Sequence, residues 1–169
     1  MKYKDTNIEK GHFIQVIDKH KGIIYKIANA YSRSSEDQED IAQEIILQLW
    51  SSFERYDPKY KLTTWIYRIA LNVSITHYRK DTVRKKYTIP MNEHLIESSI
   101  PEDYNPSEDI RLLRKFIQEL DEMNRALMIL YLDGNSHQEI SNVLNISVSN
   151  VGTKINRIKE KLKNKFKEN

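Results

Sequence analysis

Apolar residues recur every three or four positions through most of the first eighty residues, which is the spacing of one face of an α-helix. Polar breaks divide this pattern into three stretches. The first predicted helix carries the stripe Phe13, Val16, Ile17, His20, Ile24, Ile27, Ala28 and Tyr31. The second carries Ala42, Ile45, Ile46, Leu49, Trp50 and Phe53. The third carries Trp65, Ile66, Ile69, Ala70 and Val73.

Capping and breaking residues mark the ends of these helices. Ser34-Ser35-Glu36 is typical of a helix start, and Pro58 predicts a stop because proline disfavours helical geometry in the residue before it. Thr63 or Thr64 is the expected cap of the third helix.

The helical pattern stops after residue 86 and returns at residue 107. Residues 87–106 hold three of the four prolines and no repeating apolar face, so they are predicted to be a flexible linker. Ser107-Glu108-Asp109 then indicates a new helix start. The stripe that follows is Ile110, Leu113, Ile117 and Leu120. The expected fold is all-α, with two small helical domains at residues 8–86 and 107–169.

A short helix and a longer helix with a polar face are predicted near the C-terminus, with a very tight turn between them. Residues 127–132 are apolar and end at Asp133-Gly134, where a left-handed glycine is expected. Ser136-His137-Gln138-Glu139 has the form of a capping box, and Ser147 can cap the next helix. The later helix packs through Val148, Val151, Ile155, Ile158 and Leu162. This arrangement is typical of a helix-turn-helix, whose second helix enters a DNA major groove.

Polar residues occupy the other side of that second helix, where hydroxyl, amide and cationic groups can contact base edges or phosphates. The candidates are Ser149, Asn150, Thr153, Lys154, Asn156 and Arg157. A plain helical hairpin with a basic tail is the alternative. Gly152 lies inside the helix, where it costs about 1 kcal/mol relative to alanine. Close approach of the helix backbone to DNA is one explanation, and simple tolerance is the other.

Composition narrows the possible classes of protein. The net charge of +3 hides basic blocks at residues 79–86 and 154–167 and acidic blocks at 36–44 and 97–109. Segregated basic blocks favour a polyanionic partner, although one block alone usually marks a solvated surface. Because there is no cysteine, disulfides and thiolate metal sites are excluded. Residues 1–20 lack the apolar core of a signal peptide and no apolar run approaches a membrane span, so a cytoplasmic protein without membrane insertion is expected.

The first domain contains three linked motifs: DIAQE followed by IILQLW at 40–50, FERYDP at 53–58 and TWIYRIALN at 64–72. In this order they resemble region 2 of bacterial sigma factors. The segment QEISNVLNISVSNV at 138–151 resembles the helix-turn-helix of region 4. Two regions joined by a short linker are similar to the extracytoplasmic-function (ECF) group of the sigma-70 family. The resemblance covers nearly the whole chain apart from residues 1–7 and the linker. Members often carry a basic residue where this chain has Gly152.

The resemblance implies that the second helix docks on the coiled coil of the polymerase β′ subunit. Acidic and amide groups suit a basic partner helix. The candidate residues are Asp40, Gln43, Glu44 and Gln48. It also implies that region 4 contacts the β flap and the −35 promoter element.

The third helix is implied to open and hold the −10 element. Aromatic faces and cations capture unstacked bases. The implied −10 contacts are Tyr67, Arg68, Asn72, His77, Arg79 and Lys80. Asn72 aligns with a family asparagine near the pocket for a flipped base. Trp65 is expected in the core and Tyr67 at the DNA strand. Residues 73–77 are expected to form a loop or to begin the next helix.

These features predict an ECF-type sigma factor that binds core RNA polymerase and directs it to promoter DNA. An anti-sigma factor is a further implied partner; no cofactor or metal is expected. A stand-alone helix-turn-helix regulator is the alternative, but it explains only the C-terminal half. An enzyme is the other alternative. Residues that would serve as metal ligands are His12, His20, His77, Asp37, Asp40 and Glu44. No metal, phosphate-loop or nucleophile motif accompanies them, so the protein is expected to lack catalytic activity.

Overall fold

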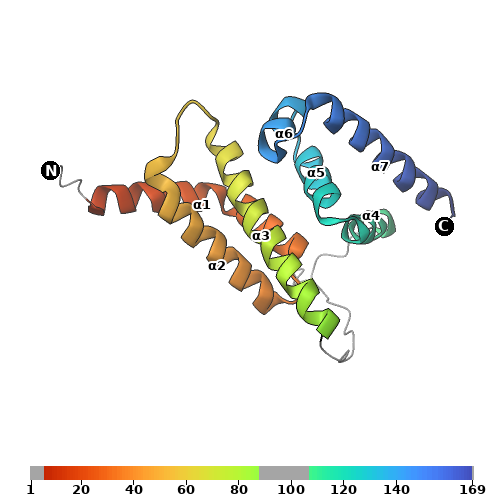
Figure 1. Ribbon diagram of the computed structural model, residues 1–169, viewed down its shortest axis with the longest axis horizontal. Coiled ribbons are helices and arrows are strands. Elements are labelled where there is room, and N and C mark those ends of the chain that lie inside the picture. Colours follow the sequence, from red (N-terminus) through yellow and green to blue (C-terminus); the bar gives the residue numbers. More distant parts are fainter. Residues whose placement is uncertain (1–5, 88–106, 169) are drawn as a thin grey trace. The chain divides into compact units, whose positions relative to one another are not determined.

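The computed structural model describes residues 6–87 and 107–168, with side chains described for 10–84 and 107–167. Within these ranges the chain forms seven α-helices and one short 3-10 helix, with no strand. Its contacts divide the chain into two compact units, residues 1–98 and 99–169 (Figure 1). The all-α prediction is therefore confirmed. The predicted first domain ended at residue 86, whereas its last helix ends at Tyr87; residues 88–106 of the predicted linker lie outside the described residues.

The first unit is built from three helices that all pack against one another. They are α1 (Thr6–Tyr31), α2 (Ser35–Ser52) and α3 (Leu62–Tyr87), with the 3-10 helix η1 (Phe53–Arg55) after α2. The predicted stripes supply most of the core, which also takes in Ile41 and Leu71. Ser34 caps α2, since its Oγ accepts the backbone N–H of Asp37 at 3.1 Å. His20 lies half-buried on α1, where burial and the nearby Lys19 lower the pKa of its imidazole.

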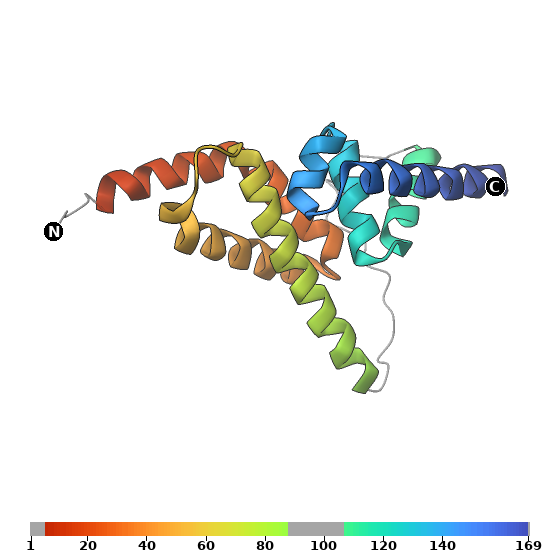
Figure 2. The ribbon, with the colours of Figure 1, turned by 45° about the horizontal axis from the view of Figure 1, so that its top comes forward.

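Two expectations about α3 were wrong. The helix starts at Leu62, and Trp65 donates its backbone N–H to the Lys61 carbonyl, so neither Thr63 nor Thr64 is the cap. The helix also runs without a break through residues 73–77, where a loop or a new helix was expected. β-Branched residues weaken helix propensity there, but burial of Ser74 and Ile75 against α1 and α2 outweighs it. Figure 2 shows the C-terminal end of α3 extending past α1 and α2.

The second unit is organised around one buried helix. Its elements are α4 (Glu108–Glu119), α5 (Glu122–Leu132), α6 (His137–Leu144) and α7 (Val148–Glu168). All six residues from 125 to 130 of α5 are buried, and α5 contacts each of the other three helices. Gly134 ends α5 with φ of +80°, as predicted.

The helix α4 starts where it was predicted to start, but its capping bond and its buried face differ from the prediction. Ser107 occupies the N-cap position, but its side chain makes no capping hydrogen bond. Phe116 is the buried residue of α4, at 4% exposed, whereas Ile110 of the predicted stripe lies at the surface. The true apolar face is therefore rotated toward the aromatic residue, which removes more apolar area from water than an isoleucine does.

Arg125 is a buried cation that holds the turn between α4 and α5. Its side chain is 4% exposed, and Nη2 donates to the carbonyl oxygens of Gln118 at 2.6 Å and Leu120 at 3.1 Å. Carbonyls at a helix C-terminus lack partners within the helix, so the guanidinium satisfies groups that burial would otherwise leave unpaired.

Candidate polymerase and nucleic-acid interfaces

The helix-turn-helix predicted from the sequence is present as α6 and α7. Ser136 Oγ accepts the Glu139 backbone N–H at 3.2 Å, and Glu139 Oε2 accepts the Ser136 N–H at 2.8 Å, which completes the capping box. Asn145 turns the chain with a left-handed φ of 55°. Ser147 then caps α7, since its Oγ accepts the Asn150 N–H at 3.2 Å. Local capping therefore sets both the end of α6 and the start of α7.

The two sides of α7 differ sharply in burial. Val151, Ile155 and Ile158 are buried, as predicted, whereas Leu162 is half-buried and Val148 is 39% exposed. The predicted DNA contacts lie on the other side: Lys154 is partly buried, and the exposed residues are Ser149, Asn150, Thr153, Asn156 and Arg157. We call these five exposed residues the α7 polar face. Thr153 Oγ1 donates to the Ser149 carbonyl at 3.0 Å, which directs that hydroxyl along the helix.

Two lysines in the C-terminal half of α7 turn back onto their own unit. Lys159 Nζ donates to the Tyr131 hydroxyl at 2.5 Å and lies 4.5 Å from the centre of the tyrosine ring. Lys165 Nζ pairs with the Glu119 carboxylate, and this hydrogen bond lowers the pKa of Glu119. The basic tail is thus partly used to pack α7 on α4 and α5.

One side of α2 presents the predicted polymerase contacts together. Asp40, Gln43, Glu44 and Gln48 are all exposed, and Gln48 Nε2 donates to Glu44 Oε1 at 3.2 Å. The opposite side is buried through Ile41, Ala42, Ile45 and Leu49. We call the four polar residues, together with Leu47, the α2 docking face.

Leu47 was missed in the sequence analysis. Its side chain is 61% exposed and lies one turn from both Gln43 and Glu44, so it is an apolar group at the centre of a polar surface. The signal was available, because Leu47 falls outside the stripe that buries Ile45 and Leu49. Trp50 follows at 44% exposed, with its ring 4.9 Å from that of Phe13 in an edge-on contact.

The predicted −10 contacts on α3 separate into exposed and buried residues. Asn72, Arg79 and Lys80 are exposed, and Arg68 is partly exposed. The Arg68 guanidinium lies 5.6 Å from the centre of the exposed Tyr60 ring. Arg68, Asn72 and Arg79 fall at helical spacing on one side of α3, and we call this the α3 stripe.

Tyr67 does not belong to that stripe. It is 6% exposed and lies in the core, so the prediction that it meets a DNA strand was wrong. Trp65 is partly exposed and packs beside Tyr56, with ring centres 5.3 Å apart, and Phe53, at 6.2 Å. Both positions have apolar helical spacing, and only the packing of α3 on α1 and α2 determines which aromatic ring is more deeply buried.

His77 faces the turn between α1 and α2. Its Nε2 lies 3.4 Å from Asp37 Oδ1, while Asp37 Oδ2 accepts the backbone N–H of Arg33 at 2.8 Å. The Arg33 guanidinium pairs with Asp81 at 2.6 Å and lies over the Tyr78 ring at 5.7 Å. These contacts hold the end of α3 on the turn.

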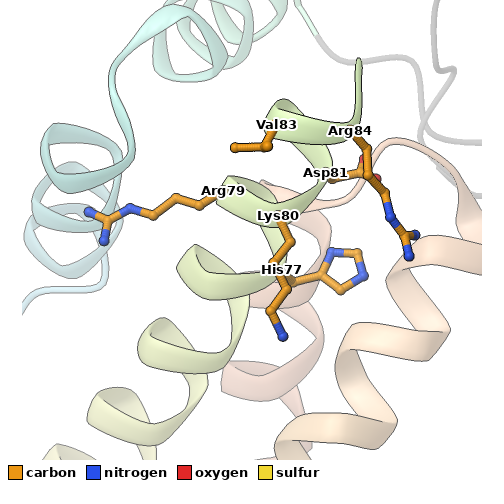
Figure 3. Close-up of a pocket in the computed structure, with 6 residues that line it drawn as sticks. All are labelled: His77, Arg79, Lys80, Asp81, Val83 and Arg84. Carbon is orange, nitrogen blue, oxygen red and sulfur yellow. The ribbon is translucent and has the colours of Figure 1, made fainter. Parts of the chain in front are cut away.

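A hollow lies at the same end of α3, and the described residues that line it are His77, Arg79, Lys80, Asp81, Val83 and Arg84. Figure 3 shows Arg79 and Arg84 pointing to opposite sides of the helix, with Lys80 next to His77. The basic side chains thus fan out from α3 while His77 and Asp81 face the turn.

The described residues show neither of two other kinds of site. Across 6–87 and 107–168, His, Asp and Glu do not gather in groups of three or more that would hold a metal ion. In the same ranges no helix combines the length and apolar character needed to cross a membrane.

Comparisons with known proteins agree with this geometry. Residues 16–84 match the family model for sigma-70 region 2, and residues 110–162 match that for sigma-70 region 4. The chain is 27% identical to the ECF RNA polymerase sigma factor SigW of Bacillus subtilis, covering 99% of this chain and 97% of that protein. It is 28% identical to the ECF RNA polymerase sigma-E factor of Escherichia coli K12, covering 83% and 81%.

Solved structures show the same fold at low identity. The sigma factor RpoE of Bartonella quintana, in complex with the anti-sigma factor NepR, superposes with a TM-score of 0.75 at 17% identity, covering 92% of this chain and 97% of that one. CnrH, in complex with the cytosolic domain of CnrY, gives 0.69 at 20% identity, covering 95% and 90%. The two matched regions, in order and on separate helical units, establish that this chain belongs to the sigma-70 family of RNA polymerase sigma factors and to its ECF group.

Proposed function

We propose that this protein binds core RNA polymerase through its first unit and directs the enzyme to promoters that both units recognise. The observation that carries the proposal is the presence of two helical units, each matching one sigma-70 region and each with an exposed polar face suited to its role. A stand-alone regulator would account for α6 and α7 but not for the α2 docking face or the α3 stripe.

The α2 docking face is the proposed contact with the β′ coiled coil of the polymerase. Its carboxylates and amides complement a basic helix, and Leu47 supplies an apolar contact at the centre. The β flap is the proposed second contact, with the second unit.

The α3 stripe is the proposed contact with the −10 element. Tyr60 with Arg68 above its ring provides an aromatic and cationic platform of the kind that unstacked bases use. Asn72 follows one turn after Arg68, and the exposed Arg79 and Lys80 are the proposed phosphate contacts. His77 and Arg33 support this surface from the other side of α3. The α7 polar face, with Lys154, is the proposed −35 contact.

Mixing the purified chain with core polymerase and a promoter fragment tests the proposal. The fragment is obtained by selecting duplexes from a randomised pool with the reconstituted enzyme. We expect the chain alone to bind this duplex poorly and the complex with core enzyme to bind and transcribe it. Equal binding by the chain alone would favour the stand-alone regulator.

We expect Asn72→Ala to impair promoter opening more than duplex binding. In this proposal the exposed amide holds a base that has left the duplex, so its loss removes an interaction made only in the open complex. Permanganate footprinting should show unpaired thymines reduced by about tenfold, corresponding to roughly 1.4 kcal/mol, while binding of closed duplex changes little.

Asn29→Ala is the matched control, because Asn29 is also an exposed asparagine within a helix, on α1 away from the α3 stripe. It should leave opening unchanged. Normal thymine reactivity in the Asn72 variant would remove Asn72 from the −10 site.

Regulation and location follow from the same proposal. Two structures with this fold are complexes with a second protein, one of them an anti-sigma factor, and we infer that an anti-sigma factor also sequesters this chain. We place the protein in the cytoplasm with the polymerase. Sigma factors are specificity subunits, so the polymerase supplies the catalysis and this chain supplies none.

A further inference from the structure

Gly152 lies at the edge of the α7 polar face. Ser149 and Asn156, three residues before it and four after it, are both exposed and share its side of the helix. A side chain at position 152 would therefore leave α7 at the border of the surface proposed to contact DNA. Because glycine has no side chain, residue 152 leaves this space available to another residue.

The imidazole of His137 fills the place beside Gly152. A Cβ built at position 152 would lie 3.7 Å from both Cε1 and Nδ1 of His137. This is ordinary van der Waals contact, so alanine would fit, but a long side chain would compete with the ring for the same space. His137 is the first residue of α6 and is exposed. Its ring therefore covers the backbone of α7 while it remains open to solvent.

We propose that His137 is an additional contact to the DNA backbone at the −35 element, and that Gly152 keeps the place for its ring. In a helix-turn-helix the first helix crosses the phosphate backbone while the second enters the groove. His137 lies at the start of α6 and packs against the edge of the α7 polar face. In this docking geometry its side chain would face the phosphates next to the bases that α7 contacts. The inference rests on the proposed −35 role of α7.

The chemistry of the two groups fits this placement. A neutral imidazole has one N–H donor and a protonated one has two, and phosphate oxygens accept such bonds. The N-terminus of α6, ordered by its capping box, also favours a negative group nearby. Phosphate contacts carry no sequence information, so His137 contributes to affinity and leaves the choice of bases to α7.

Packing alone is the alternative role for His137. In that case the ring holds α6 against α7, and its loss would lower stability without a specific effect on DNA. The two roles predict different responses to arginine, which restores a phosphate donor but not the flat ring on Gly152.

The test uses the full chain reconstituted with core polymerase and the duplex selected by the wild-type complex. Affinity is measured for that duplex and for its single-base variants within the −35 element, and melting temperature is measured for each variant protein. We expect His137→Ala to weaken binding about tenfold, equally for every sequence, with unchanged melting temperature. His137→Arg should bind like the wild type. Arg157→Ala, on the α7 polar face, is the control for the site itself and should also weaken binding.

A second pair of variants tests whether a side chain at position 152 can replace the contact made by the side chain at position 137. Gly152→Lys in the His137→Ala background should recover most of the lost affinity, because its chain can occupy the place left by the ring. The same lysine in the wild-type background should increase the affinity less, since the imidazole of His137 already occupies the space that the lysine side chain would need. Such non-additivity of the two substitutions would indicate that the side chains at positions 137 and 152 compete for the same space.

Each other result overturns the inference in a distinct way. If Arg157→Ala weakens binding and His137→Ala does not, His137 is not a contact but the proposed function stands. If both variants bind like the wild type, the −35 role of α7 fails as well. If His137→Ala and His137→Arg lose affinity and stability together, the role of His137 is packing.

Discussion

Leu47→Glu is expected to reduce binding of the protein to core polymerase by at least about 30-fold, or roughly 2 kcal/mol, the effect of removing a central apolar anchor from an interface. Leu47 is 61% exposed, so the free protein loses little stability from the change. In the complex the new carboxylate would be buried at the centre of the α2 docking face, where no water compensates it.

The carboxylates around Leu47 help to separate the effect of the added charge from the effect of the lost apolar contact. Asp40 and Glu44 already make the face suitable for a basic partner, so added negative charge does not by itself oppose docking. A large loss of affinity would therefore indicate that the apolar side chain of Leu47 itself contacts the polymerase. Fluorescence anisotropy of the labelled chain titrated with core enzyme measures it.

Ile14→Glu is the matched control, because Ile14 is 57% exposed on α1 of the same unit, outside the α2 docking face and outside the second unit that is proposed to contact the β flap. It should bind nearly as the wild type does. Binding of the Leu47 variant within threefold of the wild type would remove Leu47 from the interface. Equal losses in both variants would indicate a general effect of the added charge.

Arg125→Met is expected to destabilise the second unit by about 2–4 kcal/mol. Methionine retains much of the apolar length of the side chain but leaves the carbonyls of Gln118 and Leu120 without their buried donor. A unit of this size has a total free energy of unfolding of about 3–9 kcal/mol. The loss is therefore a large fraction of what holds α4 to α5.

The position of the tryptophans makes the measurement specific. Trp50 and Trp65 are the only tryptophans, and both lie in the first unit. Denaturant unfolding followed by far-ultraviolet circular dichroism should show the second unit unfolding earlier, while the tryptophan fluorescence transition stays in place. Arg111→Met, at an exposed position on α4, should change the free energy of unfolding by less than about 0.5 kcal/mol. Coincident shifts of both signals would contradict the assignment to one unit.

Local signals in the sequence predicted the elements that depend on neighbouring residues. The capping box at Ser136 and Glu139, the cap at Ser147 and the left-handed Gly134 all use hydrogen bonds or backbone angles within a few residues. The same is true of the α2 cap at Ser34. The helix-turn-helix was predictable for this reason, as were the two groups of helices and their family.

Errors occurred where contacts between distant segments outweigh local preference. The family resemblance implied a loop or a new helix at residues 73–77, yet packing on α1 and α2 keeps α3 continuous. Phe116, which lay outside the predicted stripe, is the buried residue of α4, while Leu113, Ile117 and Leu120 of that stripe are half-buried. Tyr67 was expected at DNA and lies in the core, because the rotation of α3 about its own axis depends on both neighbouring helices.

The sequence by itself determined that this protein is helical, where most helices begin and end, and which family it belongs to. These properties depend on the spacing of apolar residues and on capping residues that lie close together in the sequence. Only the tertiary structure decided which residues lie at the surface together. It exposed Leu47, buried Tyr67 and Arg125, and brought His137 beside Gly152. Those placements depend on how whole helices pack against one another, and packing is a property of several segments at once.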